Sequence, residues 1–303
     1  MGTEQYDPWY IEPYVLMDSK SYIPLEVTPA SVWIPINNEM RDCPCQSPIL
    51  DTTEYYKISK VNKRSFEFYK EVRGELVNIL EGLELYTRVI LEKDEQSILD
   101  CIFNLRDRGR AGLLKERTYS EPRKWMRGKG RITIQCGYCY NFTNDRQGNP
   151  PGILRYDQVD LLPPMVKWMI KQMVRWNILL FDCITDNCII NPYDEGDYIP
   201  PHIDHHDFVR PFCTVSFMSE SNILFEKEIH VLSPREFKGS VEIPLPIGSV
   251  LVLKGNGTDV VKHCIPKVQR RRVSVIFRRM DNNKILFGFQ PDSELEELLP
   301  YEL

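Results

Sequence analysis

The sequence of 303 residues contains no uninterrupted apolar run near the roughly 20 residues that a membrane-spanning helix requires. Its start also lacks the basic residues of a signal peptide, because Glu4 and Asp7 stand there instead. Tyr6 occupies the position where a myristoylation signal carries Ser or Thr. The sequence therefore predicts neither secretion, nor membrane insertion, nor a lipid anchor.

The cysteines do not form the regular pattern of a disulfide framework. There are 9 of them, an odd number, and they are scattered along the chain. This usage fits a reducing compartment, so we expect a cytoplasmic and/or nuclear location. Cys43 and Cys45 have no second pair at zinc-finger spacing, and we interpret them as ordinary thiols.

An overall excess of positive charge is also missing, since the formal net charge is −5 at pH 7. Basic residues are instead concentrated between Arg106 and Arg131, where ten basic side chains stand against three acidic ones. Such a stripe can hold phosphates on an acidic protein, because salt confines each charge to about 8 Å. A solvated helix and loop is the alternative interpretation.

Proline density divides the chain. The first 48 residues hold seven of the 22 prolines, which regular helices do not tolerate. We therefore interpret residues 1–60 as a Pro-rich N-terminal arm that is partly disordered or packed on the body. Residues 61–291 are expected to form one domain, followed by an acidic tail, residues 292–303, which we expect to be solvated.

Two segments have the apolar spacing of amphipathic helices. In residues 91–109, apolar side chains recur at i, i+4 and i+7. A second helix is predicted from Pro163, because proline suits the first turn of a helix. Its apolar side carries Val166, Met169, Ile170 and Met173.

Helical spacing disappears after about residue 181. Short apolar runs then alternate with Gly, Pro and Asn, as in FCTVSFM, SVLVLKG and RVSVIFR. Runs of this length predict the antiparallel strands of a sandwich, barrel or jelly roll. Because no helices intervene, a parallel α/β sheet is excluded.

A possible metal site lies in the segment IPPHIDHHD. His202 and Asp204 are two residues apart, and in a strand such residues point to the same face. His263 follows a later predicted strand that a jelly roll can bring back against this pair. Two imidazoles and one carboxylate on one face form the facial triad of non-haem Fe(II) oxygenases. His205, His206 and His230 are interpreted as ordinary histidines.

A second pattern suits a small dicarboxylate. Arg272 and Arg278 are six residues apart, so both lie on one face of a strand and about 20 Å apart along it. Two guanidinium groups can close that gap around a five-carbon diacid. Upstream, Asn191 and Tyr193 also share a face, and both can form hydrogen bonds with a bound acid. A basic edge strand and a simple turn are the alternatives.

Taken together, N-x-Y-x-x-G, H-x-D, a distant His and R-x(5)-R resemble the AlkB family of Fe(II)/2-oxoglutarate dioxygenases. The similarity runs from about residue 82 to residue 291 and is closest to the plant members that demethylate N6-methyladenosine in RNA. It implies an α+β fold with a double-stranded β-helix (jelly-roll) core at about residues 181–289. It also implies N-terminal supporting helices and a nucleotide-recognition lid at about residues 124–142.

The resemblance assigns roles residue by residue. Iron would be bound by His202, Asp204 and His263. Asn191 and Arg278 would hold the end of 2-oxoglutarate nearest the metal, and Tyr193 and Arg272 the far carboxylate. Where the bacterial founder of the family has an asparagine two residues after the first arginine, this chain has Ser274.

The lid is expected to bind the substrate. The resemblance implies that Lys129 and Arg131 meet phosphate or the substrate edge and that Tyr138 borders the pocket. The alternation in ITIQCGYCYNF also places Cys136, Tyr138 and Tyr140 on one strand face, an aromatic wall for an extruded base. A core-facing strand is the alternative.

The implied activity is oxidative removal of the methyl group of N6-methyladenosine in single-stranded RNA, such as mRNA. It would use Fe(II), 2-oxoglutarate and O2 and release succinate, CO2 and formaldehyde. We expect a monomer with no membrane partner. The alternatives are repair of 1-methyladenine or 3-methylcytosine, a non-catalytic jelly roll that binds methylated RNA, and a thiol oxidoreductase based on Cys136 and Cys139.

Overall fold

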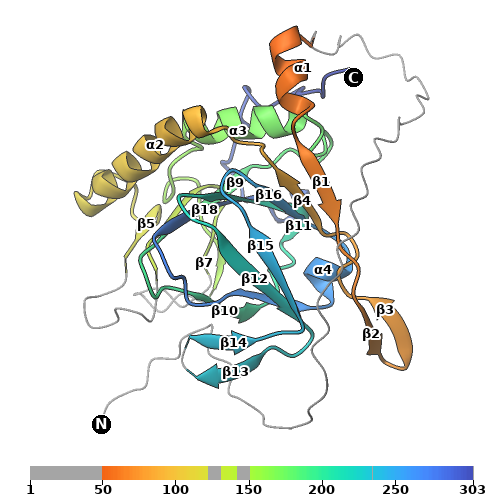
Figure 1. The fold of residues 1–303 in the computed structure, drawn as a ribbon. Coiled ribbons are helices and arrows are strands. Elements are labelled where there is room, and N and C mark those ends of the chain that lie inside the picture. The colour runs from red at the N-terminus through yellow and green to blue at the C-terminus, as the bar shows by residue number, and fades with distance from the viewer. Residues whose placement is uncertain (1–49, 122–130, 142–150, 234, 303) are drawn as a thin grey trace, which may run out of the picture.

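The computed structural model describes residues 50–121, 131–141, 151–233 and 235–302. Two antiparallel sheets dominate it, in agreement with the predicted α+β fold and its jelly-roll core (Figure 1). In strand order, the large sheet contains β1 (Asn62–Ser65), β4 (Glu84–Thr87), β16 (Val250–Leu253), β11 (Phe208–Phe217), β18 (Arg272–Met280), β9 (Asn187–Tyr193), β6 (Thr133–Gly137) and β5 (Tyr119–Ser120). The small sheet contains β10 (Ile199–His202), β17 (Lys262–Ile265), β12 (Ser221–Glu226) and β15 (Val241–Leu245).

Three hairpins and the helices complete the described fold. The hairpins pair β2 (Tyr69–Val72) with β3 (Glu75–Asn78), β7 (Tyr140–Asn141) with β8 (Gly152–Ile153), and β13 (His230–Ser233) with β14 (Glu236–Lys238). The helices are α1 (Thr52–Ile58), α2 (Glu92–Arg110), α3 (Pro164–Arg175), α4 (Asn256–Asp259) and the 3-10 turn η2 (Asn282–Lys284). None of the described helices has the length and apolar character needed to cross a membrane.

Side chains alternate between the two faces of the large sheet and thereby form two separate hydrophobic cores. On β16, Val250 and Val252 pack in the cluster that includes α2 and α3, whereas Leu251 and Leu253 face the small sheet. This follows because successive side chains of a strand point to opposite faces. Figure 1 shows α2 and α3 lying across one side of the large sheet, with β12 and β15 on the other. The helices thus cover one face, and the other face is left to form a site with the small sheet.

The two predicted helices are confirmed. In α3, the apolar residues Val166, Met169, Ile170 and Met173 are fully buried, and Pro164 lies in its first turn. The predicted helix at residues 91–109 corresponds to α2, which buries Ile98, Leu99 and Ile102. Both helices support the large sheet from outside and contribute nothing to the cavity described below.

Residues 50–60 of the predicted arm pack on the body, but they form a helix, which the proline density of the first 48 residues did not predict. No proline follows Pro48 until Pro122, so nothing prevents a helix there, and α1 forms. Asp51 caps it by accepting a hydrogen bond from the Glu54 amide at 2.8 Å, and Ile58 is buried in the core. Residues 1–49 of the predicted arm lie outside the described residues.

The predicted tail at residues 292–303 contacts the body, although most of its residues are exposed or half-buried. Leu295 is buried against the helical core. Lys167 of α3 forms ion pairs with Asp292 and Glu294, both at 2.7 Å. Asp292 and Glu294 thus have partners on a helix that lies more than a hundred residues earlier, and these contacts anchor the segment to the body.

Candidate metal and cosubstrate site

The small sheet brings the three predicted metal ligands together. His202 ends β10 and pairs in register with His263 of β17, while Asp204 follows two residues after the strand end. One ligand atom from each residue lies within 4.8 Å of the others. The Nε2 atom of His263 is 3.4 Å from an Asp204 carboxylate oxygen. At bond lengths of about 2.1 Å, ligands of one ion lie about 3–4 Å apart, so the set fits a divalent metal.

Neighbouring groups fix the state of these ligands. The carbonyl of Pro200 lies 2.8 Å from Nδ1 of His202, which leaves Nε2 as the atom available to a metal. Burial and the adjacent His263 lower the pKa of His202 to about 4. Burial alone would raise the pKa of Asp204, but His263, His202 and Arg278 outweigh it and hold that pKa below its usual range. At neutral pH the site therefore offers an uncharged imidazole and a carboxylate, as metal binding requires.

The lowered pKa of His202 predicts that the metal-free protein loses stability at acidic pH. The folded His202 has a pKa of about 4, below the value of about 6.5 in an unfolded chain. Between these values the unfolded state binds the extra proton, so stability is lost as the pH falls through this window. We expect the melting temperature of the chelator-treated protein to fall by roughly 3–6 °C more for wild type than for His202→Gln between pH 6.5 and pH 4.

The control for this measurement is His230→Gln, since His230 is exposed on β13. It should keep the wild-type pH dependence in the same thermal denaturation series. Identical curves for His202→Gln and wild type would contradict a depressed pKa at His202.

Both predicted cosubstrate arginines lie on β18 with their side chains buried. Arg272 is 1% exposed and Arg278 is 2% exposed, although each carries a charge. One Nη atom of Arg278 lies 3.8 Å from Asp204, which puts this arginine beside the metal ligands. Arg272 stacks over the ring of Tyr193, with 5.2 Å from its Cζ to the ring centre. The two ends of the arginine pair thus face different parts of one cavity.

Asn191 and Tyr193 approach the same cavity from β9, which pairs directly with β18. Arg131 donates a hydrogen bond from Nε to Oδ1 of Asn191 at 3.0 Å. The buried amide nitrogen of Asn191 then has no hydrogen-bond partner among the described residues. The hydroxyl of Tyr193 lies 3.3 Å from Oγ of Ser274, the residue that replaces the asparagine of the bacterial founder.

One cavity between the sheets joins these groups. Its lining includes every predicted metal and cosubstrate residue, namely His202, Asp204, His263, Asn191, Tyr193, Arg272 and Arg278. Aliphatic side chains such as Ile223, Leu245 and Ile276 form the rest of the wall. Two buried N–H groups of Arg272, at Nε and Nη1, have no hydrogen-bond partner among the described residues. Because unpaired buried donors are costly, this end of the cavity fits a carboxylate ligand.

The structure differs from the predicted aromatic wall of the lid. Gly137 has a φ of +79° and ends β6, so the alternation does not continue past it. Cys136 consequently packs in the helix-side core, whereas Tyr138 and Tyr140 pack in the core between the sheets. Neither tyrosine lines the cavity, and each is less than 10% exposed, as the alternative of a core-facing strand implies; their role in stacking a base stays a prediction.

Specific neighbours cover both tyrosines. The ring of Phe289 lies 4.2 Å from that of Tyr138, and the ring of His205 lies 4.5 Å from that of Tyr140. Of the other predicted substrate residues, Arg131 does line the cavity, while Lys129 lies outside the described residues.

The thiol oxidoreductase hypothesis does not fit the site of Cys136 and Cys139. Both side chains are buried, and no helix follows them, since the next element is β7. Burial raises the pKa of Cys136 to about 12 and that of Cys139 well above its usual value. A reactive thiol needs the opposite shift.

Three polar residues near the arginines were not identified in the sequence. Thr214 lines the cavity, Ser216 accepts a hydrogen bond from Arg272, and Asn187 accepts one from Arg278. A signal existed for Asn187, because it lies an even number of residues from Asn191 and so shares its strand face. For Thr214 and Ser216 the sequence signal was weaker, because each is only a small hydroxyl residue in the mostly apolar segment FCTVSF.

The chain is similar in sequence to several RNA demethylases. The chain is 51% identical over 246 residues to RNA demethylase ALKBH9B of Arabidopsis thaliana, covering 81% of this chain and 48% of that protein. It is 26% identical to RNA demethylase ALKBH10B of Arabidopsis thaliana, covering 76% of this chain and 40% of that protein. It is 28% identical to RNA demethylase ALKBH5 of Rattus norvegicus, covering 77% and 59% respectively. The chain thus spans about half the length of these relatives.

Other comparisons add little. No protein-family model matches the chain. A solved structure described as "The structure of OsALKBH1" has a TM-score of 0.43 and 13% identity, covering 65% of this chain and 98% of that one. The family assignment of the chain therefore rests on the 51% identity and on the sheet topology.

Proposed function

Because the chain belongs to the AlkB family, we propose that it removes the methyl group from N6-methyladenosine in single-stranded RNA, with Fe(II), 2-oxoglutarate and O2. The observation that carries this proposal is the convergence of His202, Asp204 and His263 beside a buried arginine pair in one cavity. The relatives named RNA demethylases support an RNA substrate. When bound, the iron and its cosubstrate supply the oxidation of the methyl C–H bond.

The residues of the chain bind and orient the reactants. His202, Asp204 and His263 would hold the metal, each through one ligand atom. Arg278, beside Asp204, receives the carboxylate nearest the metal, and the unpaired N–H groups of Arg272 receive the far one. The aliphatic side chains of the wall make the cavity less polar than water, which strengthens both ion pairs.

The test is mass spectrometry of nucleosides after incubation with single-stranded RNAs that carry different methyl groups. We expect N6-methyladenosine to be converted to adenosine, with succinate formed in proportion and no conversion when Fe(II) or 2-oxoglutarate is omitted. Conversion of 1-methyladenine or 3-methylcytosine alone would support the repair alternative. Tight binding of methylated RNA without any conversion would support the non-catalytic one.

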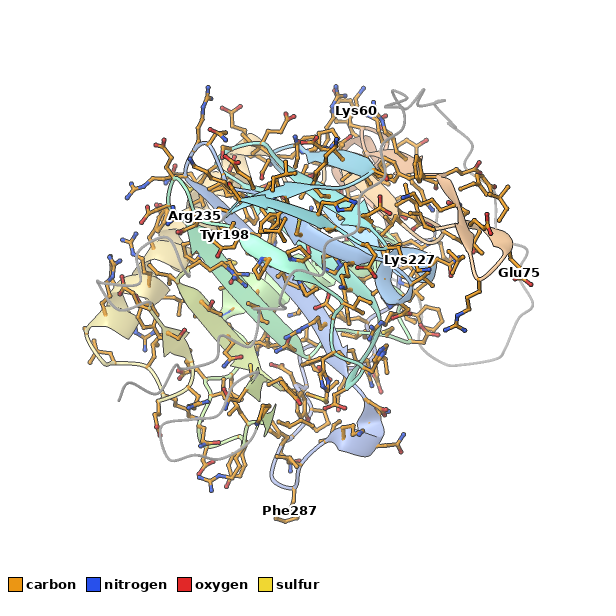
Figure 2. The ribbon with its side chains drawn as sticks, turned by 90° about the horizontal axis from the view of Figure 1, so that it is seen from below. Lys60, Glu75, Tyr198, Lys227, Arg235 and Phe287 are labelled. Atoms are coloured by element: carbon orange, nitrogen blue, oxygen red, sulfur yellow. The ribbon has the colours of Figure 1, made fainter. Side chains whose placement is uncertain are left out.

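We infer that the loop after β18 offers an exposed aromatic side chain to RNA. Phe287 is 102% exposed, whereas the predicted Tyr138 lies under Phe289. This loop adjoins the metal ligands, because Lys284 forms an ion pair with Asp207 at 3.4 Å, three residues after Asp204. Figure 2 shows Phe287 projecting from the edge of the molecule. An exposed ring with a lysine nearby suits a base and its phosphate.

We therefore expect Phe287→Ala to weaken single-stranded RNA binding about 5- to 150-fold, as the loss of one stacked base of about 1–3 kcal/mol implies. Fluorescence anisotropy with a labelled oligonucleotide measures it. Tyr69→Ala is the control, since Tyr69 is 54% exposed on the β2–β3 hairpin, whose end at Glu75 lies far from Phe287 in Figure 2. Equal affinities of both variants would exclude this loop from the RNA surface.

A further inference from the structure

Neutral side chains hold both buried arginines of the cavity. Nε of Arg278 donates to Oδ1 of Asn187 at 2.9 Å. Nη2 of Arg272 donates to Oγ of Ser216 at 3.2 Å. Asn187 is completely buried and Ser216 is 1% exposed, so both contacts are shielded from water. Each arginine thus has one fixed hydrogen bond to an uncharged partner.

The position of Asn187 is itself fixed from two sides. It pairs in register with Arg278 across β9 and β18. Its amide nitrogen donates to Sγ of Cys139 at 3.3 Å. Because a guanidinium group only donates hydrogen bonds, the amide must present its oxygen to Arg278. The asparagine therefore has a single orientation, and it restricts the rotation of the arginine.

The neutrality of these partners has a consequence for ligand charge. Among the described residues, no carboxylate forms an ion pair with Arg272, and the one beside Arg278 is the metal ligand Asp204. A buried charge without a counterion is costly, and a bound anion relieves that cost. A carboxylate in place of Asn187 would add a permanent negative charge beside Arg278 and leave less attraction for the ligand.

We propose that Asn187 is a positioning residue that fixes Arg278 for a carboxylate of the cosubstrate without adding a negative charge beside the guanidinium. Ser216 has the parallel role at Arg272. This inference rests on the proposed function only in that the cavity binds 2-oxoglutarate. It differs from a packing role, because packing requires the shape of asparagine and not its neutrality.

The charge of the side chain at position 187 provides the test. Asn187→Asp keeps the size and the hydrogen-bond acceptor, so a packing role would be preserved. We expect the Kd of 2-oxoglutarate to rise at least about 30-fold in Asn187→Asp, because the new carboxylate competes for Arg278. In Asn187→Ala we expect about a 10-fold rise, from losing a hydrogen bond to a charged group. The second site is tested by Ser216→Ala, which should raise the Kd more modestly.

The measurement is isothermal titration calorimetry of 2-oxoglutarate into the full chain loaded with Mn(II), after the Kd of Mn(II) alone has been measured. The matched control is Ser219→Ala, since Ser219 is a buried serine whose hydroxyl donates to the Arg271 carbonyl at 2.9 Å and not to a guanidinium. Mn(II) affinity should stay within about 3-fold of wild type in Asn187→Ala and Ser216→Ala, because neither residue touches the metal ligands.

The outcomes are distinguishable. If Asn187→Asp binds 2-oxoglutarate as wild type does, the positioning role is overturned while the proposed function stands. If Asn187→Asp fails to fold, Asn187→Ala and Ser216→Ala provide the test. Wild-type affinity for 2-oxoglutarate in both variants overturns the inference. If the wild type binds 2-oxoglutarate but demethylates no RNA, the proposed function fails and the positioning role is retained. Absence of 2-oxoglutarate binding by the wild type overturns both.

Discussion

Replacing Asp204 by alanine is expected to lower the proposed RNA demethylation at least about 1000-fold, because the cluster of His202, Asp204 and His263 then loses its carboxylate. Changes to groups that merely orient a metal ligand cost about 10–100-fold, and the loss of a ligand exceeds that. Two histidines alone bind a divalent ion weakly and do not fix its open positions. The remaining activity is measured as adenosine formed from N6-methyladenosine at saturating Fe(II).

The variant also removes a charge beside Arg278, at 3.8 Å, so the binding of metal and of 2-oxoglutarate should be followed separately. Asp194→Ala is the matched control. Asp194 is an exposed carboxylate that pairs with Arg271 at 3.0 Å and does not contribute to the metal cluster. It should retain most of the activity. More than a tenth of wild-type activity in Asp204→Ala would rule out this carboxylate as a ligand.

The site was predictable where strand alternation alone determines which residues meet. On β18, Arg272, Ser274, Ile276 and Arg278 face the cavity, while the residues between them face the helices. The period of two in RVSVIFR carries that information without any knowledge of partners. The same rule selected Asn191 and Tyr193 on β9, and order along the chain brought His263 to His202 because β17 pairs with β10.

The sequence was insufficient where one residue breaks the alternation or where the partner is distant. Gly137 interrupts the strand alternation with its positive φ, so Tyr138 does not follow the face predicted from Cys136. The anchoring of Leu295 and its neighbours depends on lysines of α3, and no local pattern announces such a contact. Asn187 has a function only in relation to Arg278, which the register of β9 and β18 supplies. These contacts thus depend on the pairing of segments that are distant in the sequence, which local patterns do not specify.

Replacing Arg272 by methionine is expected to raise the Kd of 2-oxoglutarate at least about 100-fold, since the far carboxylate loses a charged, two-pronged partner. The ligand-free protein should nevertheless keep or raise its melting temperature. The guanidinium is 1% exposed, two of its N–H groups have no partner among the described residues, and burial lowers its pKa. Methionine fills a similar volume without an uncompensated charge.

The measurement is the melting temperature of the Mn(II)-loaded protein with and without saturating 2-oxoglutarate, because a ligand that binds only the folded state raises it. Arg271→Met is the matched control: Arg271 is the adjacent residue, 71% exposed, and pairs with Asp194 at 3.0 Å. It should show the full wild-type shift, whereas Arg272→Met should show almost none. A preserved shift in Arg272→Met would mean that the diacid does not reach this end of the cavity. Loss of this melting-temperature shift together with a higher ligand-free melting temperature would mean that the Arg272 charge destabilises the fold and is needed for binding the ligand.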